Sequence, residues 1–347
     1  GYMARAAFVM DRLLCRFGLP GHAFVPLLSS HACALPGILG TKLIPDPRDR
    51  LTTILVAPFM SCSARLPVYV LLTSLLFAGR PMMAAVVFTG CYLLGASAAM
   101  ASAWLARRTI LPGRSSPMVL ELPSYKRPSL QTALFNAYHQ GRDFLSKAGT
   151  LIIGISVVMW WLSAYPQAAP PQEAEVLRTE AAALVQTAPE EAARLQAEAD
   201  YLSAKHSQSR SFAGRLGRTV QPAFAPLGFD WQLTMGVLTS FLAREIFVST
   251  MAVLTVGDEA ADVEDRGVIE RIRRARRDDG SLLFTPSVAA SLLVFFVLAM
   301  QCLPTLALTG RQTGSFKWAW LQFGYMSTVA YVFALATYHG LHLLGVS

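Results

Sequence analysis

Apolar residues run in long blocks along this chain, and short polar segments separate the blocks. About eight blocks predict membrane helices, at residues 1–17, 22–44, 51–78, 82–106, 148–165, 231–256, 282–308 and 318–345. Several of the blocks contain uncharged runs longer than the roughly 18 residues that indicate a spanning helix. The pattern therefore predicts an all-α fold, a polytopic membrane helical bundle.

Three polar segments between the blocks carry most of the charge. Residues 107–147 are basic, residues 166–230 form a long insert with an Ala/Glu-rich middle, and residues 257–280 contain a cluster of arginines. Basic loops tend to stay on the cytoplasmic side of a membrane. We therefore expect both basic loops and both chain termini to be cytoplasmic, and the insert to be an extracytoplasmic, solvent-exposed helical segment.

The composition agrees with a membrane protein. Hydrophobic residues make up 53% of the 347 residues and charged residues 15%, with a mean hydropathy of +0.41, whereas soluble proteins carry about 25% charged residues. The net charge of +8 comes largely from loops, where aromatic residues do not interleave with the basic ones, so we expect no nucleic-acid partner. The chain contains no P-loop, HExxH, GxSxG or GxGxxG sequence, so this chain is not expected to be an enzyme.

Two cysteines precede prolines inside apolar blocks. Cys33 lies three residues before Pro36, and Cys302 lies two residues before Pro304. Proline interrupts the hydrogen bonds of a helix, so we expect the helix at 22–44 to be interrupted at Pro36–Gly37. Carbonyl groups freed within a membrane need protein, water or a ligand beside them. A thiol next to such carbonyls indicates a site for a soft divalent cation such as Fe²⁺, Zn²⁺, Mn²⁺ or Co²⁺. The alternative is that both cysteines are small buried hydrophobic residues.

Further candidates lie near these cysteines or in similar sequence. Ser61 and Cys62 lie between two prolines of another apolar block, where small residues either allow close helix packing or line the pathway. Three secondary candidates flank the paired cysteines: His31, Met300 and Gln301. On a regular helix His31 does not share a face with Cys33, but in an unwound segment it could. None of the five cysteines lies in a CxxC pair, so we expect no disulfide framework.

A short sequence occurs twice in the chain. Residues 2–9 resemble residues 241–248, and a cysteine–proline pair follows each copy. An odd number of helices separates the copies, which predicts inverted repeats whose broken helices meet near the middle of the membrane; chance similarity is the alternative. Charges are costly inside a membrane, so we expect a structural ion pair among Arg5, Arg244 and Glu245. A direct metal contact by Glu245 is the alternative.

The same features divide the chain into four parts. We predict a first repeat at 1–78, two connecting membrane helices with the basic loop at 79–165, the insert at 166–230 and a second repeat at 231–347. The chain opens in what looks like the middle of a helix, so we expect it to be a fragment that is truncated at its start.

Several segments resemble the membrane region of the bacterial ferrous iron transport protein B (FeoB) family. They are residues 1–8, 32–37, 47–51, 57–67, 226–231 and 301–307. The cysteine regions are similar to the Gate domains of that family, which also occur in some nucleoside transporters. The resemblance implies uptake of Fe²⁺ across the bacterial inner membrane, with Cys33 and Cys302 at the Gate cysteine positions and Ser61 and Cys62 in the small-residue motif between them. His31 departs from the family pattern, where an apolar or small residue is usual.

The resemblance also implies partners. In that family an N-terminal G domain binds and hydrolyses GTP with Mg²⁺. We expect this domain in a missing part of the chain or on a separate polypeptide. Membrane lipid, small cytoplasmic Feo partner proteins and a homo-oligomer are the other expected partners.

Two other functions stay open from the sequence. A nucleoside or other organic-solute transporter that shares the Gate fold would need Asn, Gln and Glu side chains in its membrane helices, and these are scarce here. A membrane scaffold without transport would not be stabilised by a cation. The paired thiols favour Fe²⁺ transport over both.

Overall fold

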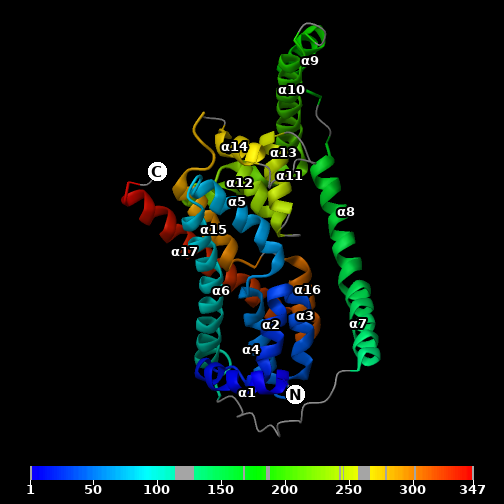
Figure 1. Ribbon diagram of the computed structural model, residues 1–347, viewed down its shortest axis with the longest axis vertical. Helices are drawn as coiled ribbons and strands as arrows, with labels where there is room; N and C mark the ends of the chain where they lie inside the picture. The colour runs from blue at the N-terminus through cyan, green and yellow to red at the C-terminus, as the bar shows by residue number, and fades with distance from the viewer. Residues whose placement is uncertain are drawn as a thin grey trace. The chain divides into compact units, whose positions relative to one another are not determined.

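Most of the chain that the structure describes is helical (Figure 1). The computed structural model describes residues 2–113, 129–166, 169–184, 188–241, 244, 246–256, 266–277, 280–300 and 302–345. Within these ranges, the only β structure is an isolated antiparallel bridge between Arg276 and Leu282. The predicted all-α fold is therefore confirmed. Glu245 and Gln301, both candidate functional residues, lie outside the described residues.

The chain divides into two compact units. Unit 1 contains Gly1–Leu66, Thr89–Gly154 and Val297–Ala330, and unit 2 contains Pro67–Phe88, Ile155–Phe296 and Tyr331–Ser347. The boundaries fall inside helices rather than in loops.

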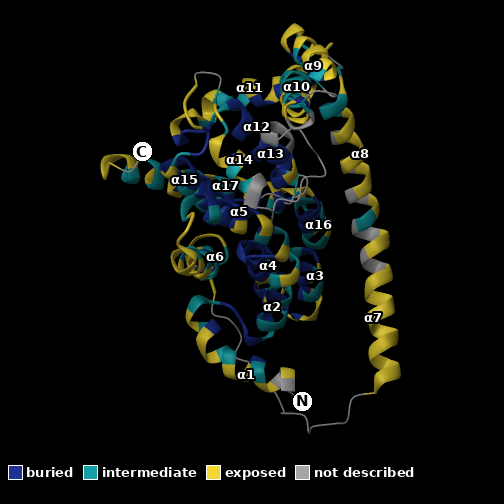
Figure 2. Ribbon diagram, turned by 45° about the horizontal axis from the view of Figure 1, so that its top comes forward, coloured by how far each residue is buried: buried dark blue, intermediate teal, exposed yellow. Residues whose placement is uncertain are grey.

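Unit 1 is built around a buried helix, α4. The helices of this unit are α1 (Tyr2–Leu14), α2 (Phe24–Ala32), α3 (Ala34–Gly40), α4 (Pro47–Val56), α7 (Leu130–Phe144), α16 (Leu303–Thr313), most of α6 (Pro81–Thr109) and the first part of α17 (Phe316–Leu343). Every residue of α4 from Thr52 to Val56 is buried, and Figure 2 shows this helix in dark blue. The Asp46 carboxylate caps α4 by accepting hydrogen bonds from the backbone N–H groups of Arg48 at 2.7 Å and Asp49 at 3.1 Å.

Helices α2 and α3 form a hairpin. A Cβ on Gly37 would overlap Ser30 Oγ and lie 2.8 Å from the Pro26 carbonyl oxygen, and a Cβ on Gly40 would lie 3.8 Å from Pro26 Cγ. Residues 26 and 40 would be about 21 Å apart along a continuous helix. The prediction of one membrane span at 22–44, interrupted at Pro36–Gly37, is therefore wrong, because the chain reverses at Cys33.

The hairpin begins and ends at one end of unit 1. Arg107, in the last turn of α6, donates its Nε hydrogen to the Gly18 carbonyl oxygen at 2.7 Å and forms an ion pair with Asp49. Arg50 donates to the Gln312 carbonyl oxygen at 3.2 Å. The α6–α7 loop and the α16–α17 loop therefore leave unit 1 from the same end. Regular alternation of eight spans would place these two loops on opposite sides, so that alternation does not fit unit 1.

Unit 2 contains the insert and the second hairpin. Its helices are α9 (Gln172–Leu184), α10 (Pro189–Arg210), α11 (Phe212–Phe224), α12 (Trp231–Ser240), α13 (Ile246–Val256), α14 (Arg266–Arg274) and most of α5 (Leu66–Leu76), α8 (Thr150–Ala164) and α15 (Pro286–Leu298). The Ala/Glu-rich segment is helical, as predicted. Its helices α9 and α10 pack together through small side chains, the buried alanines Ala174, Ala181, Ala192 and Ala199.

Helices α12 and α13 also pack against each other. The hydroxyl oxygens of Thr239 and Thr250 lie within hydrogen-bond distance, at 3.2 Å. A Cβ on Gly236 would lie 2.7 Å from Met251 Cε and 2.9 Å from Phe247 Cε2. The prediction of one membrane helix at 231–256 is therefore wrong for the same reason as at the first hairpin.

The two hairpins follow the same order of elements. Helices α1 and α11 each have 13 residues, and a three-residue 3₁₀ turn follows each, at Cys15–Phe17 and Ala225–Leu227. Gly18 and Gly228 come next, with φ of 79° and 78°, a conformation that glycine adopts without strain. A hairpin then begins in both units. This order of elements pairs α11 with α1, a register that differs from the one predicted from the sequence, and the repeat itself stays a prediction.

Four helical segments are long and apolar enough to cross a membrane. They are Pro47–Leu76, Pro81–Thr109, Pro286–Thr313 and Phe316–Leu343. They match the blocks predicted at 51–78, 82–106, 282–308 and 318–345. Of the other expected spans, α1 has 13 residues and α8 has 15, and neither is among the candidate spans of the described chain. The expected count of about eight is not confirmed.

Candidate functional site

The first of three helix interruptions in unit 1 is at Cys33. This residue has an extended backbone (φ −157°, ψ 139°) between α2 and α3. The sequence predicted an interruption at Pro36–Gly37, but Pro36 lies in the first turn of α3, where a missing N–H costs no hydrogen bond. Ala32 is the last residue of α2, so its carbonyl oxygen has no helical donor. Ser63 Oγ donates to that oxygen at 2.9 Å.

The second interruption contains Cys302. Helix α15 ends at Leu298, and Cys302 has an extended backbone (φ −158°, ψ 100°) at the N-terminus of α16. Pro304 again lies in the first turn of the new helix. Helix α16 packs against α3. The two cysteines therefore stand at the N-termini of helices that contact each other.

The third interruption separates α4 from α5 and holds Ser61 and Cys62. Cys62 has an extended backbone, with φ of −88° and ψ of 164°. Pro58 has no N–H for the Ile54 carbonyl oxygen, which would be its acceptor in a continuous helix. Gln322 of α17 donates its Nε2 hydrogen to this oxygen at 2.8 Å. A side chain from a distant part of the sequence thus replaces the missing helical donor.

Side chains of α2 and the third interruption hold these two segments together. In addition to the Ser63 bond, His31 Nδ1 lies 3.2 Å from the Ser61 carbonyl oxygen. The His31 ring also stacks on Tyr92 of α6, with 6.3 Å between ring centroids. His31 therefore has a structural role here, and its role as a metal ligand stays a prediction.

Arg65 connects the third interruption to the second. Its side chain is fully buried, at 0% exposure. The guanidinium donates to the carbonyl oxygens of Pro58 and Phe59, both at 3.1 Å, and of Ala299 at 3.2 Å. A guanidinium has five N–H donors, so one side chain satisfies several freed carbonyl groups. The sequence analysis did not predict this role, although a charge inside an apolar span was the available signal.

Helix α6 covers the third interruption with small side chains. They recur every four residues on its buried face, at Cys91, Gly95, Ala99 and Ala103. A Cβ on Gly95 would lie 2.9 Å from the Phe59 carbonyl oxygen and 3.2 Å from Ser61 Oγ. Such spacing is typical of close packing between membrane helices, and it was the sequence signal for this contact.

We call residues 31–33, 59–65 and 299–302 the three-break junction. It contains most of the predicted metal residues: Cys33 and Cys302 are half-buried, and Cys62, Ser61 and Met300 are buried. Within the described residues, no group of three or more His, Cys, Asp or Glu side chains is arranged to hold a metal ion. The junction therefore offers thiols beside hydrogen-bonded carbonyl groups, without three such side chains arranged around one point.

The residues of the predicted ion pair lie in different units. Arg5 is exposed on α1 in unit 1, and Arg244 is buried in unit 2. Glu245 lies outside the described residues. The ion pair therefore stays a prediction.

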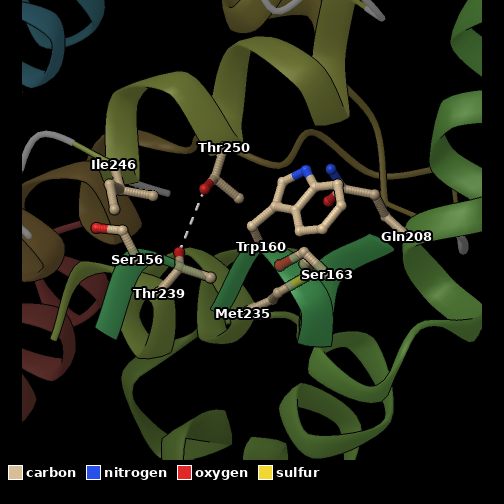
Figure 3. Close-up of a pocket in the computed structure, with 8 residues that line it drawn as sticks. All are labelled: Ser156, Trp160, Ser163, Gln208, Met235, Thr239, Ile246 and Thr250. Carbon is tan, nitrogen blue, oxygen red and sulfur yellow. Dashed lines mark hydrogen bonds between the residues drawn. The ribbon is translucent and has the colours of Figure 1, made fainter. Parts of the chain in front are cut away.

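Unit 2 contains a polar pocket of its own (Figure 3). A cavity of about 190 Å³ is lined by side chains of α8, α10, α12 and α13, among them Ser156, Trp160, Ser163, Gln208, Thr239 and Thr250. Figure 3 shows the amide of Gln208 beside the indole of Trp160. The lining has hydroxyl and amide groups and the thioether of Met235, but no thiolate, carboxylate or imidazole. It therefore offers a soft cation a single sulfur ligand.

Two family models match the chain, and the match of one lies between the two stretches matched by the other. A Gate model, described as nucleoside recognition, matches residues 1–76 and 145–316, and a model described as ferrous iron transport protein B C terminus matches residues 88–140. The Gate match covers more than half of the chain, so the chain belongs to the Gate family. The three-break junction lies within that match.

Relatives of the chain are FeoB proteins. The Fe(2+) transporter FeoB of Leptospira biflexa is 41% identical over 95% of this chain and 44% of its own length. The Fe(2+) transport protein A/FeoB fusion protein of Porphyromonas gingivalis is 36% identical over 97% of this chain and 40% of its own length. The FeoB of Helicobacter pylori is 31% identical over 99% and 52%, respectively. The predicted resemblance to FeoB is confirmed, and the chain spans about half the length of these relatives. No solved structure matches the chain.

Proposed function

We propose that this chain is the membrane permease part of a ferrous iron transporter, and that Fe²⁺ passes through the three-break junction. The supporting observation is that Cys33, Cys62 and Cys302 each occupy an extended residue at a helix interruption. Relatives named Fe(2+) transporter match nearly the whole chain. In this proposal the chain itself is not an enzyme, and GTP and Mg²⁺ would bind to a G domain outside it.

The chemistry of the junction suits Fe²⁺. Thiol ligands favour Fe²⁺ over Mg²⁺ or Ca²⁺. The carbonyl oxygens of Ala32, Ser61 and Ala299 each have a side-chain hydrogen-bonding partner, so these side chains hold polar backbone groups beside the thiols. Conduction needs sites that release the ion as well as bind it. Separate thiols meet this need better than a closed cage would.

The proposal includes an orientation in the bacterial inner membrane. The basic loop at 107–147 suits the cytoplasmic side. The contacts of Arg107 and Arg50 would then bring the N-terminus, the base of the α2–α3 hairpin and the α16–α17 loop to the same side. A crossing by α7 and α8 would carry the insert at 166–230 to the other side. A crossing by α17 would leave the C-terminus there too, in contrast to the cytoplasmic C-terminus expected from the sequence alone.

The proposal also includes inverted repeats. The α2–α3 hairpin would enter the membrane from the cytoplasm and the α12–α13 hairpin from the opposite side, an arrangement typical of transporters. The four-part division at 1–78, 79–165, 166–230 and 231–347 is kept, with the second repeat extended back to α11. A G domain in cis or in trans, small cytoplasmic Feo proteins and a second copy of the chain are the proposed partners.

Uptake of labelled Fe²⁺ tests the proposed pathway. In cells that carry the complete gene, Cys33→Ser, Cys62→Ser and Cys302→Ser should each lower the initial uptake rate at least about tenfold, which corresponds to about 1.4 kcal/mol. A hydroxyl is a poorer ligand than a thiol for this ion. Cys15→Ser is the matched control, because the Cys15 thiol donates to Asp11 at 3.3 Å, outside the junction.

Three results would redirect the proposal. Normal uptake by all three serine variants at normal protein levels would contradict the thiol pathway. Transport that nucleosides inhibit, and that does not carry Fe²⁺, would favour a nucleoside transporter. We expect Fe²⁺ but not Mg²⁺ to raise the unfolding temperature of the protein in detergent, and the absence of that shift would favour a scaffold.

A further inference from the structure

Unit 1 contains a cavity at the opposite end of α4 from the three-break junction. Its volume is about 440 Å³. The turn after α1 and the last turns of α6 supply most of its wall, with Cys15, Arg16, Gly18, Trp104, Arg107 and Arg108. Three of these six residues are arginines. Which of their positive charges are already paired therefore determines the kind of ligand that the cavity can bind.

Arg107 shapes this wall and adds no free charge to it. Its side chain is buried, forms an ion pair with Asp49, and donates to the Gly18 carbonyl oxygen at 2.7 Å. The ion pair is electrically neutral. Arg107 therefore fixes the glycine turn against α6.

Arg16 and Arg108 supply positive charge that no carboxylate neutralises. Both side chains are exposed, and neither forms an ion pair within the part of the chain that the structure describes. The guanidinium of Arg108 lies over the Trp104 ring, 4.3 Å from the ring centroid. This cation–π contact fixes the plane of the guanidinium and leaves its N–H edge available to a ligand.

The neighbouring carboxylates have other partners. Asp11 accepts hydrogen bonds from the Gly21 backbone N–H at 2.6 Å and from the Cys15 thiol at 3.3 Å. Asp46 caps α4 through two backbone N–H groups, and Asp49 pairs with Arg107. The two free guanidinium groups therefore favour an anionic ligand.

The corresponding turn of the second repeat has a different neighbour. The Gly228 carbonyl oxygen also accepts a hydrogen bond from an arginine, Arg277, at 2.8 Å. There the Tyr338 ring lies against Gly228, where a Cβ would overlap it. The similar turn at Gly228 thus has an aromatic ring against it, so the turn alone does not produce the cavity beside Gly18.

The position of the cavity on α6 favours a lipid as the ligand. Helix α6 is a candidate membrane span with only 17% of its apolar window buried, and the cavity lies at its C-terminal end. An exposed tryptophan beside arginines is typical of a membrane–water interface. Helix α1, which lies at this end of α6 (Figure 1), exposes Phe8, Val9 and Leu13. Apolar and cationic surfaces thus adjoin at the cavity.

We infer that this cavity binds the phosphate group of an anionic phospholipid such as phosphatidylglycerol. Arg16 and Arg108 donate hydrogen bonds to the phosphate oxygens, a pairing that the geometry of guanidinium favours. The acyl chains lie along the exposed face of α6. Inorganic phosphate offers the same oxygens but makes no contact with that apolar face, so the lipid binds more tightly.

Titration of the purified full chain in a neutral detergent tests the site. Short-chain phosphatidylglycerol should raise the unfolding temperature saturably, and short-chain phosphatidylcholine should not. The double variant Arg16→Gln/Arg108→Gln should weaken the apparent affinity about 30-fold, from about 1 kcal/mol for each arginine near an anionic headgroup. Its unfolding temperature without lipid should fall only slightly, because neither side chain forms an ion pair and the exposed Arg108–Trp104 cation–π contact contributes about 0.5–1 kcal/mol. Arg16→Lys/Arg108→Lys should retain most of the binding.

A matched control separates the site from general surface charge. Arg142→Gln/Arg311→Gln removes the same charge from exposed positions elsewhere in unit 1 and should bind the lipid like the wild type. Equal weakening by both double variants would overturn the site. Equal protection by phosphatidylcholine, or equal protection by inorganic phosphate alone, would overturn the assignment of an anionic lipid.

Discussion

The α2–α3 and α12–α13 hairpins begin alike and reverse differently. Each follows a 13-residue helix and a left-handed glycine whose carbonyl oxygen accepts an arginine N–H. The first hairpin reverses through one extended residue, Cys33, whereas the second reverses between Ser240 and Ile246. The α2–α3 hairpin therefore has a thiol at its turn. The two helices of the α12–α13 hairpin are joined by the hydroxyl groups of Thr239 and Thr250.

The interruptions after the two hairpins correspond to each other. The sequences Met60-Ser61-Cys62 and Met300-Gln301-Cys302 stand at the breaks of the long apolar segments that follow. This order of elements pairs Cys302 with Cys62, whereas the repeat expected from the sequence pairs Cys302 with Cys33. The two halves contribute unequally to the junction, because the Cys33 thiol is an addition of the first half.

Among substitutions that test the difference between the two hairpins, Gly37→Ala in the first hairpin should cause the largest loss of stability. The new Cβ would overlap Ser30 Oγ and lie 2.8 Å from the Pro26 carbonyl oxygen, a backbone atom that cannot rotate away. We expect the free energy of unfolding to fall by about 3 kcal/mol, measured by denaturation in detergent, and Fe²⁺ uptake to be lost. Gly40→Ala is the control, because its Cβ would make an ordinary 3.8 Å contact with Pro26. Equal stability of the two variants would show that α2 and α3 do not pack as a hairpin.

A somewhat smaller loss is expected from Arg65→Met, which removes the donor that joins the third interruption to Ala299. Three carbonyl groups lose bonds of 3.1–3.2 Å, and at roughly 0.6–1 kcal/mol each the stability should fall by about 2–3 kcal/mol. Arg311→Met, at an exposed position of α16, should have little effect. A stable Arg65→Met protein with normal uptake would show that the junction does not depend on this guanidinium.

The sequence predicted helical content better than it predicted chain reversals. Apolar blocks have the same composition whether they form one span or a hairpin of two short helices. The blocks at 22–44 and 231–256 were therefore each predicted as one span, the first with an interruption at Pro36–Gly37. The prolines located the interruptions to within a few residues, because a missing N–H acts locally. The groups that satisfy the freed carbonyls could not be predicted, since they come from distant segments: Gln322 is 268 residues from Ile54.

The second hairpin should tolerate an added methyl group better than the first. A Cβ on Gly236 would lie 2.7 Å from Met251 Cε and 2.9 Å from Phe247 Cε2, which are the ends of side chains that can shift. Gly236→Ala should therefore lower the unfolding free energy by only about 1 kcal/mol. Gly90→Ala on α6, where a Cβ meets no atom within 4 Å, should be neutral or slightly stabilising. A loss as large as that of Gly37→Ala would mean that both hairpins are equally rigid.

The smallest effects separate the two hairpins by function. Thr250→Val removes the hydroxyl bond to Thr239, and Ser63→Ala removes the bond to the Ala32 carbonyl oxygen; each should lower the unfolding free energy by about 0.6–1 kcal/mol. Only Ser63→Ala should lower Fe²⁺ uptake per folded molecule, because its bond holds the backbone next to Cys33. If Thr250→Val reduced uptake equally, the polar pocket of unit 2 would belong to the transport pathway, and the two hairpins would share one role despite their different turns.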